Sequence, residues 1–159
     1  GRGQRVLMVQ FIKGPWKSGE DFIRISNDEF RISKDGKEIP RGSFTLKKLG
    51  LGFVGILGDK LPFEEHVKAA QAALAYVKEQ LPNYDMVIMD EVNVAVSLKL
   101  INPQEVLDLL KGLPDEKIVL LTGRGAPQEF LDRADLATEM REIKHPYAAG
   151  QQGKINVEF

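Results

Sequence analysis

Residues 84–93 read YDMVIMDEVN, and residues 117–126 read KIVLLTGRGA. Each stretch contains a short run of apolar residues that ends abruptly in polar ones, which is typical of a parallel strand covered on both faces. The first run is followed by Asp90 and Glu91, and the second by a glycine-flanked Arg124. Ligands gather at the carboxyl ends of parallel strands. A carboxylate pair and a cation delivered there predict a site for a magnesium-bound polyphosphate.

Strand and helix patterns alternate around these two runs. We predict strands at residues 5–11, 53–57, 86–89 and 118–121, and helices at 63–81, 103–112 and 127–134. Residues 94–100 are ambiguous but more typical of a helix, and residues 136–143 have the mixed pattern of an edge strand. Pro62 stands where a helix tolerates proline best, and Asn102 followed by proline is an N-cap pattern. The alternation predicts an α/β domain with a parallel sheet flanked by helices.

Residues 20–48 differ in character from the rest of the chain. Short apolar runs flank polar ones, and residues 34–37 read KDGK, a strong turn signal. We therefore predict a small β-hairpin insertion, with a short helix at 44–49. Residues 1–159 as a whole are expected to form a single domain. Because the chain leads straight into a strand, we expect an upstream strand and helix to precede residue 1.

Bulk composition limits the possible partners. Apolar residues make up 43% of the 159 residues, and the formal net charge is -1. This balance is that of an ordinary globular domain and offers no general attraction to nucleic acid or to an anionic membrane. No apolar run approaches the roughly 18 residues that span a bilayer. Cysteine is absent, which excludes disulfides and thiol chemistry and fits a cytoplasmic location.

The two acids at the end of the first apolar run are the leading metal candidates. If the backbone stays extended, Asp90 and Glu91 point to opposite faces, so one would bind the ion while the other holds a water or fixes the loop. The alternative is a helix N-cap followed by a solvated glutamate. In the second stretch, Gly123 and Gly125 permit close backbone approach, and Arg124 can contact phosphate oxygens with two N–H groups.

Four further residues are candidates by position. Lys13 follows the first strand and would face the same edge, unless it is simply a solvated loop lysine. Trp16 either anchors its loop or stacks on a flat ligand. We expect a structural role for His145, and we interpret His66 as an ordinary surface residue of its helix.

Motifs that would indicate other chemistry are missing from the sequence. It contains no phosphate loop, no dinucleotide-binding fingerprint and no serine nucleophile elbow.

Five segments together resemble the P-loop type of ATP:corrinoid adenosyltransferase. They are VQFIKG at 9–14, MDEVN at 89–93, LTGRGAP at 121–127, ADLATEM at 134–140 and KHPYAAG at 144–150. The resemblance covers residues 1–19 and runs again from about residue 52 to the end. It implies a RecA-like, P-loop NTPase-type sheet, usually in a homodimer, and transfer of the 5′-deoxyadenosyl group of ATP to Co(I) of a corrinoid, with triphosphate released.

The resemblance also implies roles for particular residues. The position of Glu91 binds Mg²⁺, with Asp90 in support, and that of Arg124 contacts triphosphate. Members of the family often have Phe-Thr-Trp before the long helix, where the aromatic rings help to remove the axial ligand of Co(II). Only Phe63 is aromatic among the aligned residues here, so the corrinoid side is expected to differ. A flavin-type reductase would supply the electron.

Two further departures from the family pattern bear on function. The family's phosphate loop lies just upstream of the segment matching Gly1, and residues 20–48 are longer than the usual connection. Two alternatives therefore stay open at this point: a RecA-like ATPase, and a non-catalytic corrinoid or nucleotide carrier. Net charge -1 without a basic stripe counts against an ATPase acting on nucleic acid.

Overall fold

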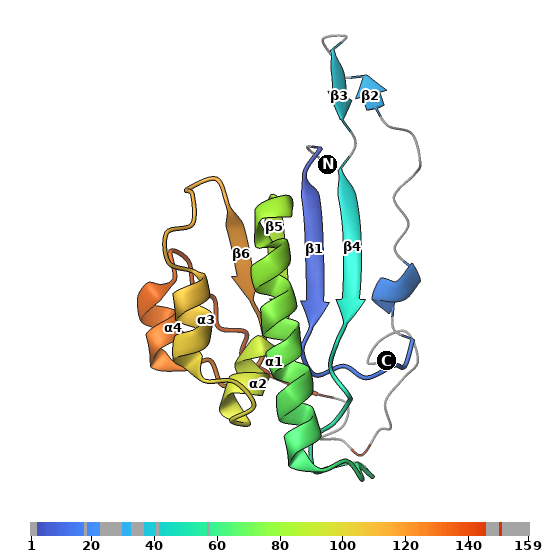
Figure 1. Cartoon of the computed structure of the whole chain (residues 1–159), viewed down its shortest axis with the longest axis vertical. Helices are drawn as coiled ribbons and strands as arrows, with labels where there is room; N and C mark the ends of the chain where they lie inside the picture. The colour runs from blue at the N-terminus through green and yellow to red at the C-terminus, as the bar shows by residue number, and fades with distance from the viewer. Residues whose placement is uncertain are drawn as a thin grey trace.

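The computed structural model describes residues 3–17, 19–22, 30–32, 37–40, 42–56, 58–145 and 150. Figure 1 shows the elements. The strands are β1 (Arg5–Gln10), β2 (Phe30–Ile32), β3 (Glu38–Pro40), β4 (Ser43–Lys48), β5 (Met86–Asp90) and β6 (Ile118–Leu121). The α-helices are α1 (Phe63–Gln80), α2 (Val92–Ser97), α3 (Pro103–Leu109) and α4 (Gln128–Arg133), with 3-10 turns η1 (Gly19–Phe22) and η2 (Leu81–Asn83).

Four strands form one parallel sheet in the order β4-β1-β5-β6. The register sets Gln10 of β1 beside Asp90 of β5, and Met89 of β5 beside Leu121 of β6. All four strands therefore end at one edge, where α2 and the first turn of α1 also lie (Figure 1). This arrangement confirms the predicted α/β class and is consistent with a P-loop NTPase-like fold.

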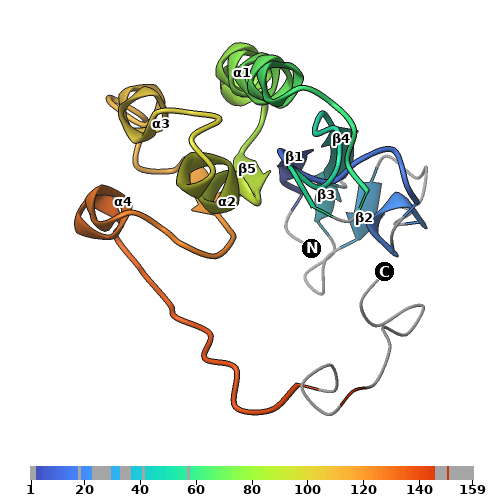
Figure 2. The same cartoon turned by 90° about the horizontal axis from the view of Figure 1, so that it is seen from below.

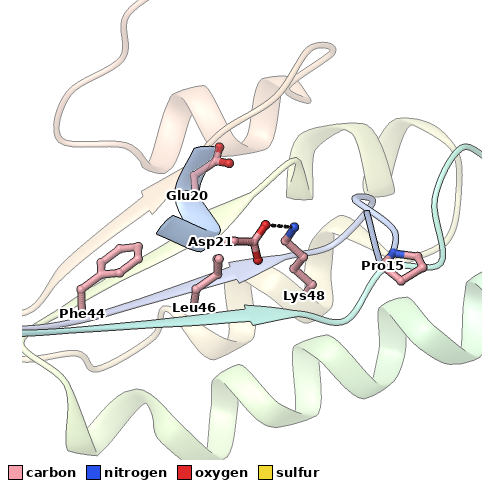
Figure 3. Close-up of a pocket in the computed structure, with 6 residues that line it drawn as sticks. All are labelled: Pro15, Glu20, Asp21, Phe44, Leu46 and Lys48. Carbon is pink, nitrogen blue, oxygen red and sulfur yellow. Dashed lines mark hydrogen bonds and ion pairs between the residues drawn. The ribbon is translucent and has the colours of Figure 1, made fainter. Parts of the chain in front are cut away.

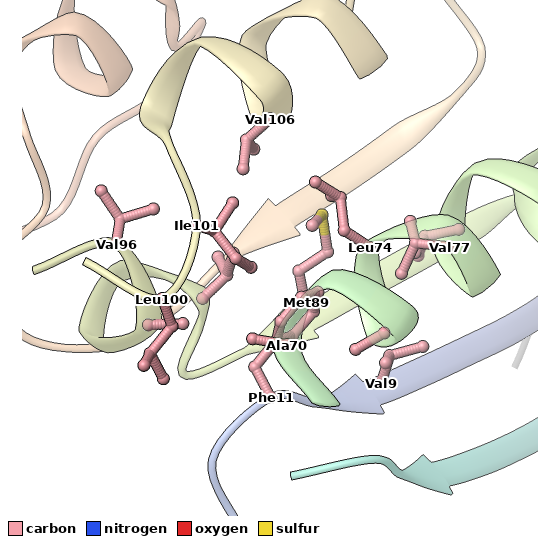
Figure 4. Packing of buried hydrophobic residues seen from close by; sticks show 14 of the residues in the cluster. Val9, Phe11, Ala70, Leu74, Val77, Met89, Val96, Leu100, Ile101 and Val106 are labelled. Carbon is pink, nitrogen blue, oxygen red and sulfur yellow. The ribbon is translucent and has the colours of Figure 1, made fainter. Parts of the chain in front are cut away.

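The core lies between the sheet and α1. Val9 of β1 and Met89 of β5 are fully buried, as are Ala70 and Val77 of α1 (Figure 4). Alanines on this face let the helix approach the strands closely, so the contact is tightly packed. Seen along the strands, α1 and α3 lie on the same face of the sheet (Figure 2). The buried apolar contact between α1 and the sheet therefore holds the strands in place, including the edge at which they end.

The opposite face of the sheet is less covered than the apolar runs predicted. Met86 and Ile88 alternate with the buried core residues and are only half-buried, and Ile118 and Leu120 are 40% and 39% exposed. The prediction of strands covered on both faces thus holds for one face only. The reason is that the long helix α1 packs on a single side of the sheet.

The predicted helices form close to their expected limits. Asn102 caps α3 as predicted: its Oδ1 accepts from the Gln104 amide at 2.9 Å, and Glu105 accepts from the Asn102 amide at 3.0 Å. This reciprocal pair satisfies two amides that a helix start otherwise leaves unbonded. The ambiguous stretch at 94–100 contributes to a helix that begins slightly earlier, at Val92.

The predicted hairpin is present, but its boundary was wrong. Strands β2 and β3 pair antiparallel, while the KDGK turn lies mostly outside the described residues. Residues 44–49 do not form a helix, because β4 joins the main sheet parallel to β1. The backbone N–H and C=O groups of β1 need hydrogen-bond partners on both sides of the strand, and β4 supplies these partners on one side. The second half of the predicted insertion is therefore part of the sheet.

Two predicted strands are wrong. Residues 53–56 form no strand, and Leu57 of this prediction lies outside the described residues. The chain turns at Gly52 (φ 110°), whose amide donates at 2.9 Å to the carbonyl of Ile12 in the segment that follows β1. Residues 136–143 have no regular structure, and Leu136 and Met140 are 86% and 94% exposed. An edge strand needs a neighbouring backbone, and this segment runs away from the sheet (Figure 2).

Among the described residues, none of the helices has both the length and the apolar character needed to cross a bilayer.

Candidate active site

The end of β5 forms an acidic corner. Asp90 is the last strand residue, and Glu91 adopts a left-handed conformation (φ 63°) that starts α2. The Asp90 carboxylate accepts from Gln10 Nε2 on one oxygen and from Thr122 Oγ1 on the other, both at 3.0 Å. Because neighbouring strands hold both of its oxygens, Asp90 acts as a fixed anionic bridge across β1, β5 and the end of β6. It fixes the loop, which is one of the roles that the sequence predicted.

Glu91 is the acid whose carboxylate lies beside the turn after β6. Its amide donates to Thr122 Oγ1 at 3.1 Å, whereas no hydrogen bond to its carboxylate is found in the part of the chain that the structure describes. Burial raises the pKa of Glu91, and the nearby charge of Asp90 raises it further, while the positive charges of Arg124 and Lys13 lower it. Both cations are therefore close enough to act on this carboxylate. Half-buried and near a second anion, Glu91 would be stabilised by added positive charge.

The turn after β6 packs directly against this acid. Gly123 has φ 116°, and a Cβ built there would lie 3.1 Å from Oε2 and 3.2 Å from Cα of Glu91. Only glycine combines this backbone conformation with this proximity. Arg124 follows immediately, so its backbone is held beside the start of α2. A Cβ at Gly125 would likewise lie 3.3 Å from the Cβ of Ser97 in α2.

Three supporting residues were missed at the sequence level: Gln10, Thr122 and Asn93. Asn93 Nδ2 donates to the Gly123 carbonyl, and its amide donates to the Thr122 carbonyl, both at 3.1 Å. Gln10 is fully buried and Asn93 nearly so, yet Gln10 Oε1 and Asn93 Oδ1 find no hydrogen-bond partner among the described residues. The available signal was a polar residue at the end of an apolar run, where a structural side chain would normally be apolar.

Lys13 lies near the same edge but has a partner of its own. Its Nζ forms a 2.8 Å ion pair with Glu20 of η1. The neighbouring Asp21 pairs with Lys48 at the end of β4, and these residues help to line a pocket of ≈ 490 Å³ between η1 and β4 (Figure 3). None of the predicted site residues lines that pocket. The ion pairs instead hold η1 next to Lys13.

Several apolar side chains in the loops after β1 and before α1 are exposed. Trp16 is 61% exposed and packs against Phe53, with ring centroids 6.2 Å apart and an interplanar angle of 34°. Phe63 is the first residue of α1 and is also exposed. The other exposed apolar residues of the segment before α1 are Leu51, Ile56 and Leu61. We call Trp16, Phe53, Ile56, Leu61 and Phe63 the apolar platform. Trp16 thus anchors its loop while leaving most of its ring uncovered.

The interpretation of His66 as an ordinary surface residue was wrong. This side chain is only 3% exposed, and its Nε2 lies 2.9 Å from Oδ2 of Asp59. Burial follows because the loop before α1 folds back over the second turn of the helix. His145 is partly buried in the segment after α4 and belongs to none of the regular elements.

The donor set fits magnesium better than a transition metal. Within the described residues, no group of three His, Cys, Asp or Glu side chains could enclose an ion. Magnesium is commonly bound by one or two carboxylates together with water and substrate phosphates. Glu91, with Asp90 held by Gln10 and Thr122, could supply one such carboxylate, because no hydrogen bond to the Glu91 carboxylate comes from the described residues.

A parallel sheet flanked by helices, with an acidic corner and an arginine turn at its carboxyl edge, is consistent with the P-loop NTPase-like class. More specifically, the chain belongs to the ATP:corrinoid adenosyltransferase family: the model of that family, described as ATP:corrinoid adenosyltransferase BtuR/CobO/CobP, matches residues 1–159. This membership confirms the resemblance seen in the sequence and places the chain among enzymes.

Curated relatives carry the same name. The corrinoid adenosyltransferase CobA of Salmonella typhimurium is 29% identical over 162 residues, which span 100% of this chain and 73% of the relative. The corrinoid adenosyltransferase of Pseudomonas aeruginosa is 30% identical, covering 100% of this chain and 71% of the relative. That of a Sinorhizobium species is 33% identical over 160 residues, with 99% and 68% coverage.

Proposed function

We propose that this protein transfers the 5′-deoxyadenosyl group of ATP to the Co(I) centre of a corrinoid and releases triphosphate. The observation that carries the proposal is the convergence of the Glu91 carboxylate, the Gly123 turn and two cationic side chains at one edge of the sheet. Family membership supports the choice of substrates.

The reaction places simple demands on the protein. A Co(I) electron pair attacks C5′ of ATP, the C5′–O bond breaks, and its electrons go to the departing triphosphate. No proton has to be moved, so no general base is required. The protein must align cobalt with C5′ and stabilise the leaving anion, which are contributions of proximity and preorganised charge.

The cationic side chains suit the leaving group. Arg124 follows Gly123, whose carbonyl Asn93 holds, so the arginine backbone is preorganised at the edge. We propose that Arg124 contacts triphosphate oxygens with its guanidinium, supported by the Gly123–Gly125 backbone. Lys13 would add a second positive charge, exchanging its ion pair with Glu20 for the phosphate.

Magnesium bound to triphosphate would neutralise part of the charge that develops on the leaving group. We propose Glu91 as its protein ligand, with Asp90 holding the strand ends in place. The raised pKa of Glu91 is consistent with this role, because a divalent cation would relieve the repulsion from Asp90.

The apolar platform is the proposed seat of the corrinoid. A corrin ring is broad and largely flat, and exposed aromatic side chains offer matching apolar area. Phe63 and Trp16 are the residues that we assign to this contact. A homodimer, a flavin-type reductase and a cytoplasmic location remain predictions.

The test is adenosyl transfer to chemically supplied Co(I), followed by the spectral change to alkylcobalt. Glu91→Gln and Arg124→Ala should each lower the rate by at least ~10²-fold, the size typical for losing one group that stabilises charge in a transition state. Glu64→Gln in α1 and Arg133→Ala in α4 are matched controls at exposed sites and should leave the rate unchanged. Near-normal turnover of either site variant would remove that residue from the mechanism.

A further inference from the structure

The buried His66 and the partly buried Asp59 hold the loop that carries part of the apolar platform. The Asp59 carboxylate accepts from the Gly55 amide at 2.8 Å, from the Leu61 amide at 3.0 Å and from His66. These hydrogen bonds, led by the two backbone amides, lower the pKa of Asp59. An ionised carboxylate has no proton to give, so the His66 Nε2 carries the hydrogen and donates it.

The pair ties both ends of the loop to the helix. Gly55 and Leu61 flank the bend, the Asp59 amide donates to the Ile56 carbonyl at 3.1 Å, and His66 projects from the second turn of α1. One carboxylate thus fixes the start and the end of the bend, and one imidazole fixes that carboxylate to a rigid element. Without these bonds, a loop of this length with glycines at 55 and 58 would sample many conformations.

The platform depends on that anchoring. Ile56 is 59% exposed and Leu61 is 46% exposed, so neither is held in place by burial in the core. Phe53 precedes the bend and contacts Trp16, while Phe63 follows it. Among the described residues, His66 is the buried polar side chain that anchors this loop, and it does so through Asp59.

We infer that Asp59 and His66 are positioning residues for the corrinoid, which act by preforming the apolar platform before the substrate arrives. This inference rests on the proposed function, because it assigns the platform to the corrinoid. A preformed surface binds more tightly than one that has to be ordered on binding. The pair should therefore influence the corrinoid side of the reaction and leave the nucleotide side unaffected.

Trp16 provides a direct readout, because it is the only tryptophan of the chain and belongs to the platform. Hydroxocobalamin absorbs strongly, so its binding to the intact chain should quench Trp16 fluorescence. His66→Ala should weaken this binding by roughly tenfold, because the loop would then have to become ordered when the corrinoid binds, and that ordering costs binding free energy. His66→Gln retains an N–H donor near the Nε2 position and should recover most of the affinity. Lys68→Ala, at an exposed position two residues further along α1, is the matched control.

The same variants separate a positioning role from general damage. The KM for ATP should stay within about twofold in His66→Ala while the KM for the corrinoid rises, and the Gly55 and Leu61 amides should exchange hydrogen faster. If His66→Ala does not fold, Asp59→Asn replaces it, because it keeps the side-chain shape and removes the charge that two amides and His66 share.

The outcomes distinguish this inference from the proposed function. Quenching of wild type together with equal affinity in His66→Ala, or in Asp59→Asn, would overturn the positioning role and leave the proposed function standing. An equal rise of both KM values would also overturn it, as a purely structural defect. Absence of quenching in wild type would overturn the assignment of the platform to the corrinoid and this inference with it, whereas loss of transfer in Glu91→Gln tests the nucleotide side independently.

Discussion

A Cβ built on Gly123 would lie 3.1 Å from Oε2 of Glu91, although the two residues are 32 positions apart in the chain. The contact joins the end of β6 to the corner after β5, and Asn93 secures it by donating to the Gly123 carbonyl. Because Gly123 has no side chain, the turn that carries Arg124 has room to lie against the Glu91 carboxylate. The acid and the arginine can therefore share one edge of the sheet.

Gly123→Ala should abolish most activity. The new methyl group would displace the Glu91 carboxylate, and φ 116° is strained for any residue with a Cβ. We expect at least a tenfold loss in kcat together with destabilisation of about 1 kcal/mol or more. Gly112→Ala is the matched control: it also has positive φ (68°), but a Cβ there meets open space. It should lower stability by about 1 kcal/mol without changing kcat, and equal kcat losses in both variants would contradict the steric explanation.

Glu91→Gln should stabilise the fold while it removes activity. The pKa of Glu91 is raised in the folded state, so ionisation costs folding free energy at every pH above the raised pKa. That cost declines as the pH falls through the raised pKa and vanishes below the ordinary value of 4.5. Chemical denaturation near neutral pH should therefore show a gain of a few tenths of a kcal/mol for the variant, after allowance for solvent screening. A gain that persists unchanged below pH 4.5 would point to another cause.

Activity should also depend on the charge of Glu91. On the proposed role of Glu91 as the Mg²⁺ ligand, Mg²⁺ affinity should fall as the pH drops through the raised pKa of Glu91, because only the ionised carboxylate would bind the ion. Raising the Mg²⁺ concentration should then shift the acidic limb of the pH–rate profile to lower pH, because bound cation favours the ionised form. A limb that does not move with Mg²⁺ would separate Glu91 from metal binding.

Thr122→Val should destabilise the strand ends. The Thr122 hydroxyl donates to Asp90 and accepts from the Glu91 amide, so its removal leaves two partly buried polar groups unpaired. We expect a loss of about 1–3 kcal/mol in the free energy of unfolding and a clear reduction in kcat. Ser97→Ala removes an exposed hydroxyl that bonds only the Val94 carbonyl, and should change both values little. A neutral effect of Thr122→Val on both values would show that the network does not position the acids.

Asn102→Ala should separate stability from function. It removes the capping box of α3, which is remote in sequence from the site residues, and should cost about 1 kcal/mol of stability. The rate of adenosyl transfer should be unchanged at temperatures where the variant stays folded. A reduced rate under those conditions would imply that α3 takes part in positioning the substrate.

The apolar runs at 86–89 and 118–121 identify their strands directly. A strand that packs on a core is apolar, and this property can be read from the run itself without knowing its neighbours in the fold. The sequence was equally informative for α1, whose apolar stripe and proline start are local features. It failed for β4 and for residues 53–56. Both misjudged stretches are short, and whether either pairs with a strand depends on which backbone lies beside it, which is a long-range property.

The sequence by itself determined the chemical inventory of this protein: two acids at the end of one apolar run, and an arginine in the turn that follows another. Only the tertiary structure decided how they work together. Parallel pairing puts the two strand ends side by side, the left-handed turn at Glu91 separates the roles of the two acids, and the loop before α1 buries His66 against Asp59. The first result depends on pairing between strands distant in sequence, the second on a backbone angle, and the third on how a loop folds back on its own helix, none of which an apolar or polar pattern specifies.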